Sequence, residues 1–244
     1  MSVLFEAFAS SSAGNAYRLS GGSASAPLLL ECGITWPRLQ KASGFTAVRS
    51  CGCLVSHDHM DHSKAVPDLL ANGIPCYMSA ETRAHVVSRT AHFSRLKTVE
   101  HNVPFQVGDW RCLGFQVNHD SETPGTMGYI IDAPDGTRTM FVTDCSWFAA
   151  KIPEDCNVLC IECNHDEEIV RSRVGAGKLD PVVAERSLRS HGSVQWLCDL
   201  LKASDLRKLR EIHLLHLSDS NSNEDEFKDR VQRAAGVPVY VAKA

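Results

Sequence analysis

The sequence predicts an α/β sandwich that forms one domain over residues 1–244. Short strand-type runs alternate with turns along the chain, and several are apolar at consecutive positions, as in residues 28–30 and 140–142. Strands of this kind are typical of sheets that are covered on both faces. With 244 residues, of which 43% are hydrophobic, the chain can bury a sizeable core, and its length fits one large domain better than two small ones.

Strand candidates lie along the whole chain, and each is an apolar or β-branched run that ends at a turn. They cover residues 3–9, 27–32, 51–56, 74–79, 111–119, 127–132, 139–144, 157–163, 211–217 and 237–241. The chain has no internal repeat and no low-complexity tract that would indicate a different architecture.

Helical patterns are fewer and lie mostly late in the chain. They cover residues 64–72, 81–94, 181–190, 194–202 and 224–235. The last helix has the clearest limits, because Asn223 can cap its first turn and Gly236 can end it. Strands therefore outnumber helices in the expected fold.

Composition limits the class of protein. The N-terminus has no basic region followed by an apolar stretch, and no apolar segment approaches the roughly 18 residues that span a bilayer. We expect a cytoplasmic protein without a membrane segment, whose ten cysteines are reduced and mostly buried. A formal net charge of −4 argues against a surface that binds nucleic acid over its whole extent, although residues 82–97 and 171–189 are locally basic.

Residues 56–62 read Ser-His-Asp-His-Met-Asp-His, which places three imidazoles and two carboxylates within seven positions. Imidazole together with carboxylate suits divalent cations such as zinc, manganese or iron. Burying so many polar groups without a metal would cost several kcal/mol. The run follows an apolar strand and precedes a helical pattern, which favours a metal site over a solvated histidine-rich loop.

Side chains of the metal-binding type recur where predicted strands end. His57 follows one strand, His119 and Asp144 close two others, and His216 lies near the end of a fourth. Strand ends are where loops gather into a site, so we expect these residues to converge. His213, three residues before His216, faces the opposite side of its strand and is expected to be a packed or surface residue.

The spacing predicts two divalent ions, zinc or manganese, with iron as a further option. In an extended turn, residues two apart point the same way, so His57 and His59 can bind one ion while Asp61 and His62 reach a second. Asp144 can bridge the ions, because a carboxylate offers two oxygens, and each site keeps a position for water. The expected ligands are His57, His59, Asp61, His62, His119, Asp144 and His216.

The pattern His57-x-His59-x-Asp61-His62, followed by His119, by Asp144 at a strand end and by a late histidine, resembles the metallo-β-lactamase superfamily of binuclear hydrolases. The matched motifs run from residue 8 to residue 221 and therefore cover nearly the whole chain. The resemblance implies a four-layer αββα sandwich with both metals at one edge of the paired sheets.

Residues 10–15, 162–166 and 216–221 are similar to the SSSxGN, ESNHD and HLSxxN segments of a small bacterial branch, the exonuclease-like proteins of the WalJ/YycJ type. The similarity implies metal-dependent hydrolysis of phosphodiesters in DNA. The chain departs from these patterns at Glu31, where the superfamily has aspartate, and at Cys163, which replaces a serine. A third departure lies in residues 190–193, where the histidine precedes the glycine.

A pair of bound cations implies a bridging hydroxide as the nucleophile, because metals lower the pKa of bound water from near 16 to roughly 7. Asp61 would orient this hydroxide as well as bind metal. His165 is our candidate for protonating the leaving oxygen, since imidazole titrates near neutral pH, and a hydrogen-bonded structural histidine is the alternative of equal weight. Substrate contacts are expected from short polar side chains on loops, namely Ser12, Asn15, Asn164, Ser218 and Asn221.

The predicted set of metal ligands does not identify which kind of bond is hydrolysed, because similar sites hydrolyse phosphodiesters, thioesters, lactones or lactams. A cyclic-nucleotide phosphodiesterase is the first alternative and would need a small compact pocket. A long basic groove fed by Arg83, Arg89 and Arg95 would instead favour DNA or RNA as the partner. Outside enzymes, the alternative is a binding module that is stabilised by metal.

Overall fold

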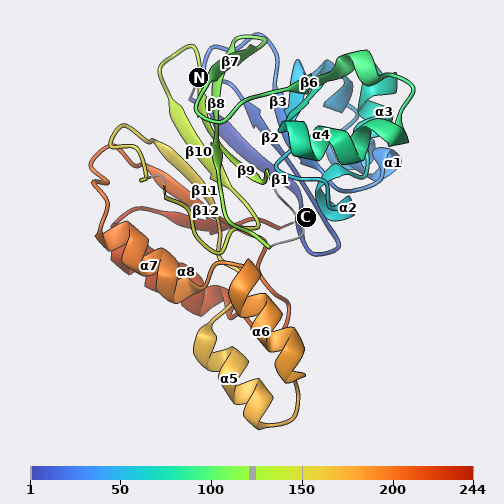
Figure 1. Cartoon of the computed structure of the whole chain (residues 1–244). Coiled ribbons are helices and arrows are strands. Elements are labelled where there is room, and N and C mark those ends of the chain that lie inside the picture. Colours follow the sequence, from blue (N-terminus) through green and yellow to red (C-terminus); the bar gives the residue numbers. More distant parts are fainter. Residues whose placement is uncertain (1, 121–124, 150, 244) are drawn as a thin grey trace.

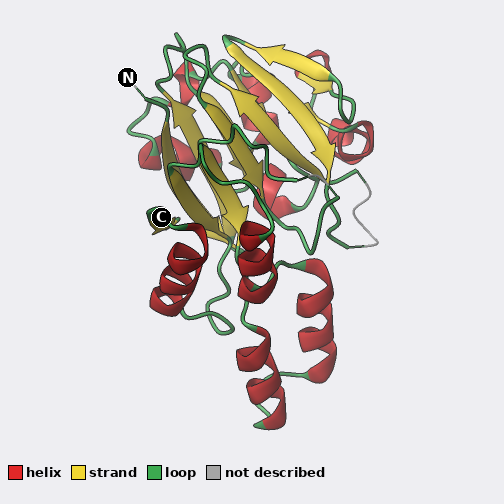
Figure 2. Ribbon diagram, turned by 90° about the vertical axis from the view of Figure 1, so that its left-hand side faces the viewer, coloured by secondary structure: helices red, strands yellow, loops and turns green. Residues whose placement is uncertain are grey.

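A computed structural model describes residues 2–120, 125–149 and 151–243 of the chain. Two β-sheets pack face to face, and helices cover the outer face of each (Figure 1, Figure 2). This arrangement is the four-layer αββα sandwich that the sequence predicts. The prediction of the fold class is therefore confirmed.

The first sheet has six strands in the order β1-β2-β3-β4-β5-β6. Strands β1 to β3 are antiparallel neighbours, whereas β3 to β6 run parallel. The carboxyl ends of β3 and β4 therefore lie at the same edge of the sheet. The strands cover Leu4–Ser11, Gly14–Ser20, Leu28–Cys32, Gly52–Leu54, Cys76–Met78 and Leu96–Thr98.

The second sheet has seven strands in the order β13-β12-β11-β10-β9-β8-β7. Strands β10 to β13 are parallel, and β7 to β10 are antiparallel. In chain order from β7 to β13 the strands cover Pro104–Val107, Trp110–Gln116, Met127–Asp132, Arg138–Val142, Val158–Glu162, Glu211–Leu215 and Val239–Val241.

Helices fall into three groups in Figure 1. The first sheet carries α1, α2, α3 and α4, which cover Trp36–Ala42, Met60–Ser63, Val66–Ala71 and Ala80–Val86. The second sheet carries α7 and α8, which cover Val194–Lys202 and Glu224–Ala235. Helices α5 and α6, which cover Glu167–Gly175 and Pro181–Ser190, project together from the body of the sandwich. Short 3-10 turns cover Ala47–Arg49, Val87–Arg89 and Phe93–Arg95.

No helix within the described ranges is long and apolar enough to cross a membrane. All ten cysteines are free thiols, and all but Cys51 are buried, as the sequence predicts. Burial raises the pKa of most of these thiols, including Cys51, where it reaches about 11. They are therefore packed in the protonated form.

Buried side chains form three layers, which match the three interfaces of the sandwich. Residues of β3 alternate between two of them. Leu28 and Leu30 belong to the layer between the sheets, together with Phe141, whereas Leu29 belongs to the layer under the helices, together with Leu69. Because successive side chains of a strand point to opposite faces, a consecutive apolar run fills two layers at once.

All ten predicted strands are present, with ends that differ by a few residues. Strands β2, β6 and β7 are additional. The segment predicted as a loop over residues 10–15 is a tight hairpin, in which Ser11 pairs with Gly14. β2 begins with Gly14 and Asn15, residues typical of turns, and this is why its sequence does not indicate a strand.

The prediction of one helix over residues 81–94 is wrong in extent. α4 ends at Val86, and a 3-10 turn and an extended Thr90 follow. The guanidinium of Arg89 donates to the carbonyl oxygens of Ser63 and Lys64, 3.0 and 3.4 Å away. This side chain is anchored on α2, and the chain leaves the helical path at that point. Helices α1, α2 and α5 were not predicted, because they are short or strongly polar.

Candidate metal centre

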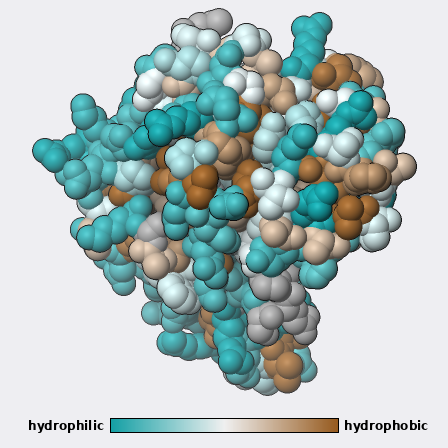
Figure 3. Space-filling view, turned by 45° about the horizontal axis from the view of Figure 1, so that its top comes forward, coloured by the Kyte–Doolittle hydropathy of each residue, from teal (hydrophilic) through white to brown (hydrophobic). Residues whose placement is uncertain are grey.

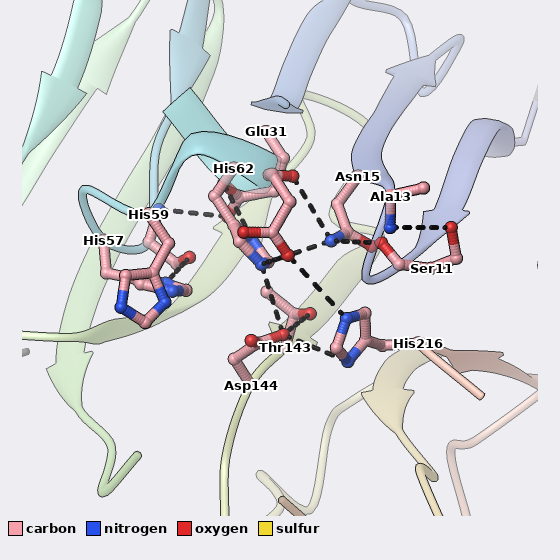
Figure 4. Close-up of polar contacts among 12 residues, drawn as sticks. Ser11, Ala13, Asn15, Glu31, His57, His59, His62, Thr143, Asp144 and His216 are labelled. Carbon is pink, nitrogen blue, oxygen red and sulfur yellow. Dashed lines mark hydrogen bonds and ion pairs between the residues drawn. The ribbon is translucent and has the colours of Figure 1, made fainter. Parts of the chain in front are cut away.

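The predicted metal ligands converge at one edge of the paired sheets. Figure 4 labels His57, His59, His62, Asp144 and His216 among them. Both sheets contribute. The first sheet supplies four of them, His57 and His59 in the loop after β4 and Asp61 and His62 in α2. The second sheet supplies the other three, which follow β8, β10 and β12: His119, Asp144 and His216.

One group of donors consists of His57, His59 and His119, whose nearest ring nitrogens all lie within 4.8 Å of one another. The ring centroids of His57 and His59 are 4.6 Å apart, and those of His57 and His119 are 5.0 Å apart. His57 and His119 are buried, while His59 is partly exposed. Three imidazoles at this spacing can bind one divalent ion.

A second group consists of Asp61, His62, Asp144 and His216, again with donor atoms within 4.8 Å of one another. Asp144 lies between the two groups. Its Oδ1 is 3.3 Å from His62 Nε2 and 3.4 Å from His216 Nδ1, and its Oδ2 is 3.6 Å from His119 Nε2. This carboxylate is therefore placed to contact an ion in either group.

Two buried nitrogens show that the donor set fits metal. Nε2 of His57 and Nε2 of His216 are both buried, and neither has a hydrogen-bond partner among the described residues. Leaving a buried polar atom without a partner costs about 1–3 kcal/mol. Since both atoms belong to the donor groups, bound cations would satisfy them. Imidazole and carboxylate donors together suit zinc, manganese or iron.

The charges of the site are also suited to cations. Burial lowers the pKa of His57 and of His119, so both imidazoles are neutral at pH 7, the form that binds metal. Burial also opposes the charge on Asp144, but the neighbouring His216 and His62 hold its pKa well below the usual range. Burial lowers the pKa of His62, yet the Asp144 and Asp61 carboxylates outweigh it and raise the pKa well above the usual value. His62 is therefore protonated at pH 7 and must release its proton to bind a metal.

Buried polar groups orient the donor side chains. Oε1 of Glu31 accepts from the backbone N–H of Ser56, at 3.0 Å, and its Oε2 lies 3.4 Å from His62 Nδ1. Nδ1 of His57 contacts the Ser56 hydroxyl at 2.9 Å, which leaves Nε2 for a metal. Such contacts fix the ring orientation of metal-binding histidines. Glu31, a departure from the family pattern, thus still reaches a donor histidine.

A hydrogen-bond chain joins the two sheets behind the donors. The backbone N–H of His216 donates to Ser10 Oγ at 2.9 Å, and this hydroxyl lies 2.8 Å from the Tyr17 hydroxyl. Tyr17 in turn donates to Asn15 Oδ1 at 3.0 Å, and Asn15 Nδ2 lies 3.2 Å from His62 Nε2. Tyr17 and Asn15 are fully buried. The chain therefore connects His216 of one sheet to His62 of the other.

Backbone geometry at three strand ends is unusual. Glu31, Asp144 and His216 have φ values of +59°, +45° and +54°, and none of them is glycine. Residues with a Cβ avoid this left-handed region, at a cost of roughly 1–3 kcal/mol each. The left-handed backbone at Glu31 near the end of β3, and at Asp144 and His216 after β10 and β12, directs these side chains into the site, and the surrounding core sustains the strain.

Glycine 33 allows α2 to approach the end of β3. A methyl group built on Gly33 would overlap the backbone carbonyl of Asp61, and it would also collide with the amide nitrogen of His62. The turn that carries these two donors thus lies directly against the backbone of residue 33. Only glycine permits this approach.

Two residues that were not predicted also face the donors, Glu162 and His191. Glu162 is fully buried, and with His191, Asp144 and His216 it forms a third group of converging donor atoms. Its Oε1 lies 2.7 Å from His191 Nδ1 and 3.0 Å from His216 Nδ1. The position of Glu162 at the end of an apolar strand is a signal like that of Asp144, whereas His191 has no signal beyond its departure from the family pattern.

Glu162 and His191 form an ion pair. Burial opposes both charges, but their mutual attraction outweighs it, so the pKa of His191 rises to about 9 and that of Glu162 falls to about 2. The imidazolium side chain is 19% exposed, and its ring centroid lies 5.2 Å from those of His119 and His216. A protonated histidine therefore lies beside the donor groups at neutral pH.

His165, the predicted proton donor, lies close to this pair but is almost fully buried, with 1% of its surface exposed. Its backbone bridges to Ser193, and its Nδ1 has no hydrogen-bond partner among the described residues. Burial lowers the pKa of His165, so the ring is neutral at pH 7.

The predicted substrate contacts divide into exposed and buried residues. Ser12 lies in the exposed turn of the first hairpin, and Ser218 is partly exposed. Asn15, Asn164 and Asn221 are buried. The amide of Asn164 donates to the His216 carbonyl at 2.8 Å, and Asn15 contacts His62 as described above.

The remaining histidines lie apart from the donor groups. Asp58, between His57 and His59, turns away and contacts His85 Nδ1 at 2.8 Å. His213 packs against Phe5 and Tyr240, with ring centroids 4.6 and 5.3 Å away. The prediction that His213 is a packed residue is confirmed.

The αββα fold and its edge cluster of histidines and aspartates together define a metal-dependent hydrolase. A family model described as a beta-lactamase superfamily domain matches residues 33–203. The chain belongs to the metallo-β-lactamase superfamily.

Among the relatives in sequence is the exodeoxyribonuclease YycJ of Bacillus anthracis, 26% identical over 92% of this chain and 86% of the relative. The exodeoxyribonuclease WalJ of Streptococcus pneumoniae is 23% identical over 89% of this chain and 82% of the relative. Among solved structures, the metallo-beta-lactamase fold protein YhfI from Bacillus subtilis has a TM-score of 0.73 at 18% identity, covering 100% of this chain and 98% of its own. The short form of human tRNase Z has a TM-score of 0.63 at 15% identity, and the match covers 98% of this chain and 96% of the tRNase Z chain.

Proposed function

We propose that the chain is a binuclear metal-dependent phosphodiesterase that acts on DNA. The observation that carries the proposal is the convergence of all seven predicted ligands into two adjacent donor groups, with Asp144 of the second group 3.6 Å from His119 of the first. The similarity to two proteins named exodeoxyribonucleases, which spans most of this chain, supports DNA as the substrate.

In this proposal His57, His59 and His119 hold one ion, and Asp61, His62 and His216 hold the other, with Asp144 contacting both. Bound divalent ions would supply an activated water and neutralise the charge that develops on a phosphodiester. Asp61 is the most exposed carboxylate of the cluster, with 24% of its side chain accessible, and in this proposal it orients the attacking water. Asn15 and Asn164 act as positioning residues for His62 and His216.

We assign protonation of the leaving oxygen to His191 in preference to His165. Glu162 holds Nδ1 of His191 and keeps the ring protonated at pH 7. His165 is neutral at that pH and more deeply buried. A general acid must carry its proton at the working pH, and His191 meets this condition.

Metal content and activity test the proposal together. Purified protein loaded with zinc or manganese is expected to contain two equivalents of metal and to release nucleotides from end-labelled DNA. His59→Ala and Asp144→Asn should lose metal and activity together. His213→Ala, which removes a packed histidine outside the donor groups, is the matched control. Full activity in both of the first two variants would contradict the proposed site.

A panel of substrates tests whether the chain hydrolyses a phosphodiester of DNA. Duplex and single-stranded DNA, RNA, 3′,5′-cyclic nucleotides and a thioester are compared with the same metal-loaded protein. Turnover of the cyclic nucleotides or of the thioester alone would overturn DNA as the substrate.

His191→Gln should reduce kcat by about 10²-fold or more on an unactivated phosphodiester and much less on a p-nitrophenyl ester, whose leaving group needs no proton. The opposite result, a loss in His165→Gln alone, would return the role to His165.

A further inference from the structure

The molecule carries two basic segments, and the structure separates their roles. In residues 82–97, the guanidinium of Arg89 binds the carbonyl oxygens of Ser63 and Lys64, and that of Arg95 binds the carbonyl oxygen of Leu70. These side chains secure the ends of α2 and α3. The second segment, residues 171–189, has five lysines and arginines against two acidic residues and lies largely in α5 and α6.

Helix α6 begins away from the donors and ends at them. The carbonyl oxygen of Ser190, its last residue, lies 2.8 Å from His119 Nδ1, and the next residue is His191. The helix projects from the sandwich beside α5 (Figure 1). Any extended molecule that reaches the donor groups along this side must therefore pass α6.

One face of α6 lines a cavity of about 540 Å³ that also includes Asn118 and His119. The helical residues in this wall are spaced as one stripe, three or four positions apart: Val182, Glu185, Arg186 and Arg189. Arg186 is exposed and has no ion pair within the described ranges. Arg189 contacts Glu185 at 3.3 Å, but both side chains are mostly exposed, so this pair is weak and can yield to a phosphate.

The other carboxylate of the cavity is Asp120, which lies 3.7 Å from His119 Nε2. It belongs to the end of the cavity at the donor groups, where cations are expected. Arg189 directly precedes Ser190, and Arg186 lies about one turn before it in the helix. The cavity thus has a metal-binding end and a cationic wall.

An exposed tryptophan lies next to the same cavity. The backbone of Trp147 pairs with that of Asn118, and 54% of Trp147 is accessible. Hydrophobic residues on the face shown in Figure 3 occur in small groups among hydrophilic ones. Its backbone partner Asn118 lines the same cavity as Arg186 and Arg189. Proteins stack the bases of single-stranded nucleic acids on exposed aromatic side chains that lie along cationic grooves.

We propose that α6 and Trp147 form a binding site for single-stranded DNA that leads its end to the metal centre. Arg186 and Arg189 contact the phosphates next to the one that is cleaved, and Trp147 stacks on an unpaired base. This inference rests on the proposed function and narrows its substrate to a strand longer than a single nucleotide. A cyclic nucleotide has no second phosphate for these arginines.

Binding and turnover are measured separately to test the site. The double variant R186A/R189A, loaded with metal, is expected to bind a single-stranded oligothymidylate about tenfold more weakly than the original protein. The slope of log affinity against log salt should fall by roughly 1.4, since each lost phosphate contact removes about 0.7. Hydrolysis of bis(p-nitrophenyl) phosphate should not change, because this ester has no second phosphate for Arg186 and Arg189 to contact.

A matched control removes two other exposed arginines. Arg207 precedes β12 and Arg233 lies in the last turn of α8, both at the end of the strands opposite the donor groups. R207A/R233A alters the net charge equally and should leave oligothymidylate affinity within twofold of the original. Trp147→Ala should weaken binding of oligothymidylate but not of an abasic strand of the same length.

The outcomes separate the two proposals. Arginine-dependent binding of the oligonucleotide without hydrolysis of any phosphodiester would overturn the proposed function and leave the binding site intact. Hydrolysis with equal affinity and equal salt dependence in R186A/R189A and in the control would overturn the binding site alone. Equal loss of affinity in both double variants would also overturn it, since only overall charge would then matter.

Discussion

Individual residues of this site depend on partners that are far away in the sequence. His62 contacts Glu31, Asn15 and Asp144, and His216 contacts Ser10, Glu162 and Asp144. The donors themselves could be predicted from residue type and spacing. Tyr17 and His191 could not, because their roles arise only when the two sheets pack together.

Tyr17→Phe tests the hydrogen-bond chain behind the donors. Removing the hydroxyl leaves Asn15 Oδ1 and Ser10 Oγ without their buried partner, and the positions of His62 and His216 become less fixed. We expect metal affinity to fall about tenfold, the lower end of the range for outer contacts of metal ligands. Competition with a chromophoric chelator measures it.

Tyr129→Phe provides the comparison for Tyr17→Phe. The Tyr129 hydroxyl is equally buried and donates to the Val55 carbonyl at 2.7 Å, without a contact to any proposed ligand. Both variants should lose about 1 kcal/mol of stability. Equal metal affinities in the two would show that the chain through Tyr17 does not position the donors.

Secondary-structure elements place the donors through their ends. The interiors of the strands could be predicted from consecutive apolar residues. The donor residues lie where several of these strands end. Elements that lack an apolar run were missed: β2 starts with turn-type residues, and α2 is a single turn, Met60–Ser63, that contains the donors Asp61 and His62. Its helical form is imposed by contact with β3 and by Arg89, not by local propensity.

Gly33→Ala tests the contact between α2 and the end of β3. The added methyl group overlaps the Asp61 carbonyl, so α2 must shift and carry Asp61 and His62 with it. We expect the ion of the second donor group to be lost, leaving about one equivalent of metal by elemental analysis. Gly175→Ala, where the added methyl meets open space, should retain both. Two equivalents in Gly33→Ala would show that α2 tolerates displacement.

Asp166 tests how α5 is attached to the sandwich. Its Oδ1 accepts from the N–H groups of Glu168 and Ile169, which caps α5, and its Oδ2 accepts from Gln195 and Arg230 of α7 and α8. Asp166→Ala should lower the free energy of unfolding by about 2 kcal/mol at pH 7. Asp166→Asn, which keeps a capping oxygen, should lose less. Urea denaturation measures both.

The sign of the pH effect follows from the pKa of Asp166. Burial opposes the charge, but the N–H groups of α5 and the Arg230 guanidinium lower the pKa below the ordinary value. The stabilisation is therefore complete above about pH 4, the unfolded value, and is lost as pH falls through the lowered folded value. The stability difference between the original protein and Asp166→Asn should shrink over that range. A constant difference down to pH 2 would exclude the charge as its source.

For the molecule as a whole, the two sheets each bring part of the donor set. The first sheet provides His57, His59, Asp61 and His62, and the second provides the rest. The fold class and this convergence could be predicted from the sequence, since the residues of the metal-binding type lie where predicted strands end and such ends gather into a site. The direction in which α5 and α6 project could not, because their exposed polar faces are compatible with many positions.

Chelation tests the coupling of metal and fold. A ligand present at 100 times its dissociation constant stabilises the folded state by about 2.7 kcal/mol per site. We expect the thermal midpoint to fall by several degrees when EDTA removes the ions, and to recover when zinc or manganese is added. His59→Ala should show a smaller response to EDTA than the original protein. An unchanged midpoint in EDTA would mean that the ions are not bound between the sheets.

The hydrogen bonds that run from Ser10 through Tyr17 to Asn15 bear on how the two halves of the sandwich come together during folding. Ser10 belongs to the first sheet, yet it receives the N–H of His216 from the second, so this contact forms only once the halves of the sandwich have met. Metal binding by a refolding chain should then follow the formation of the two sheets. The rate of metal binding would therefore report the rate at which the two halves of the sandwich come together.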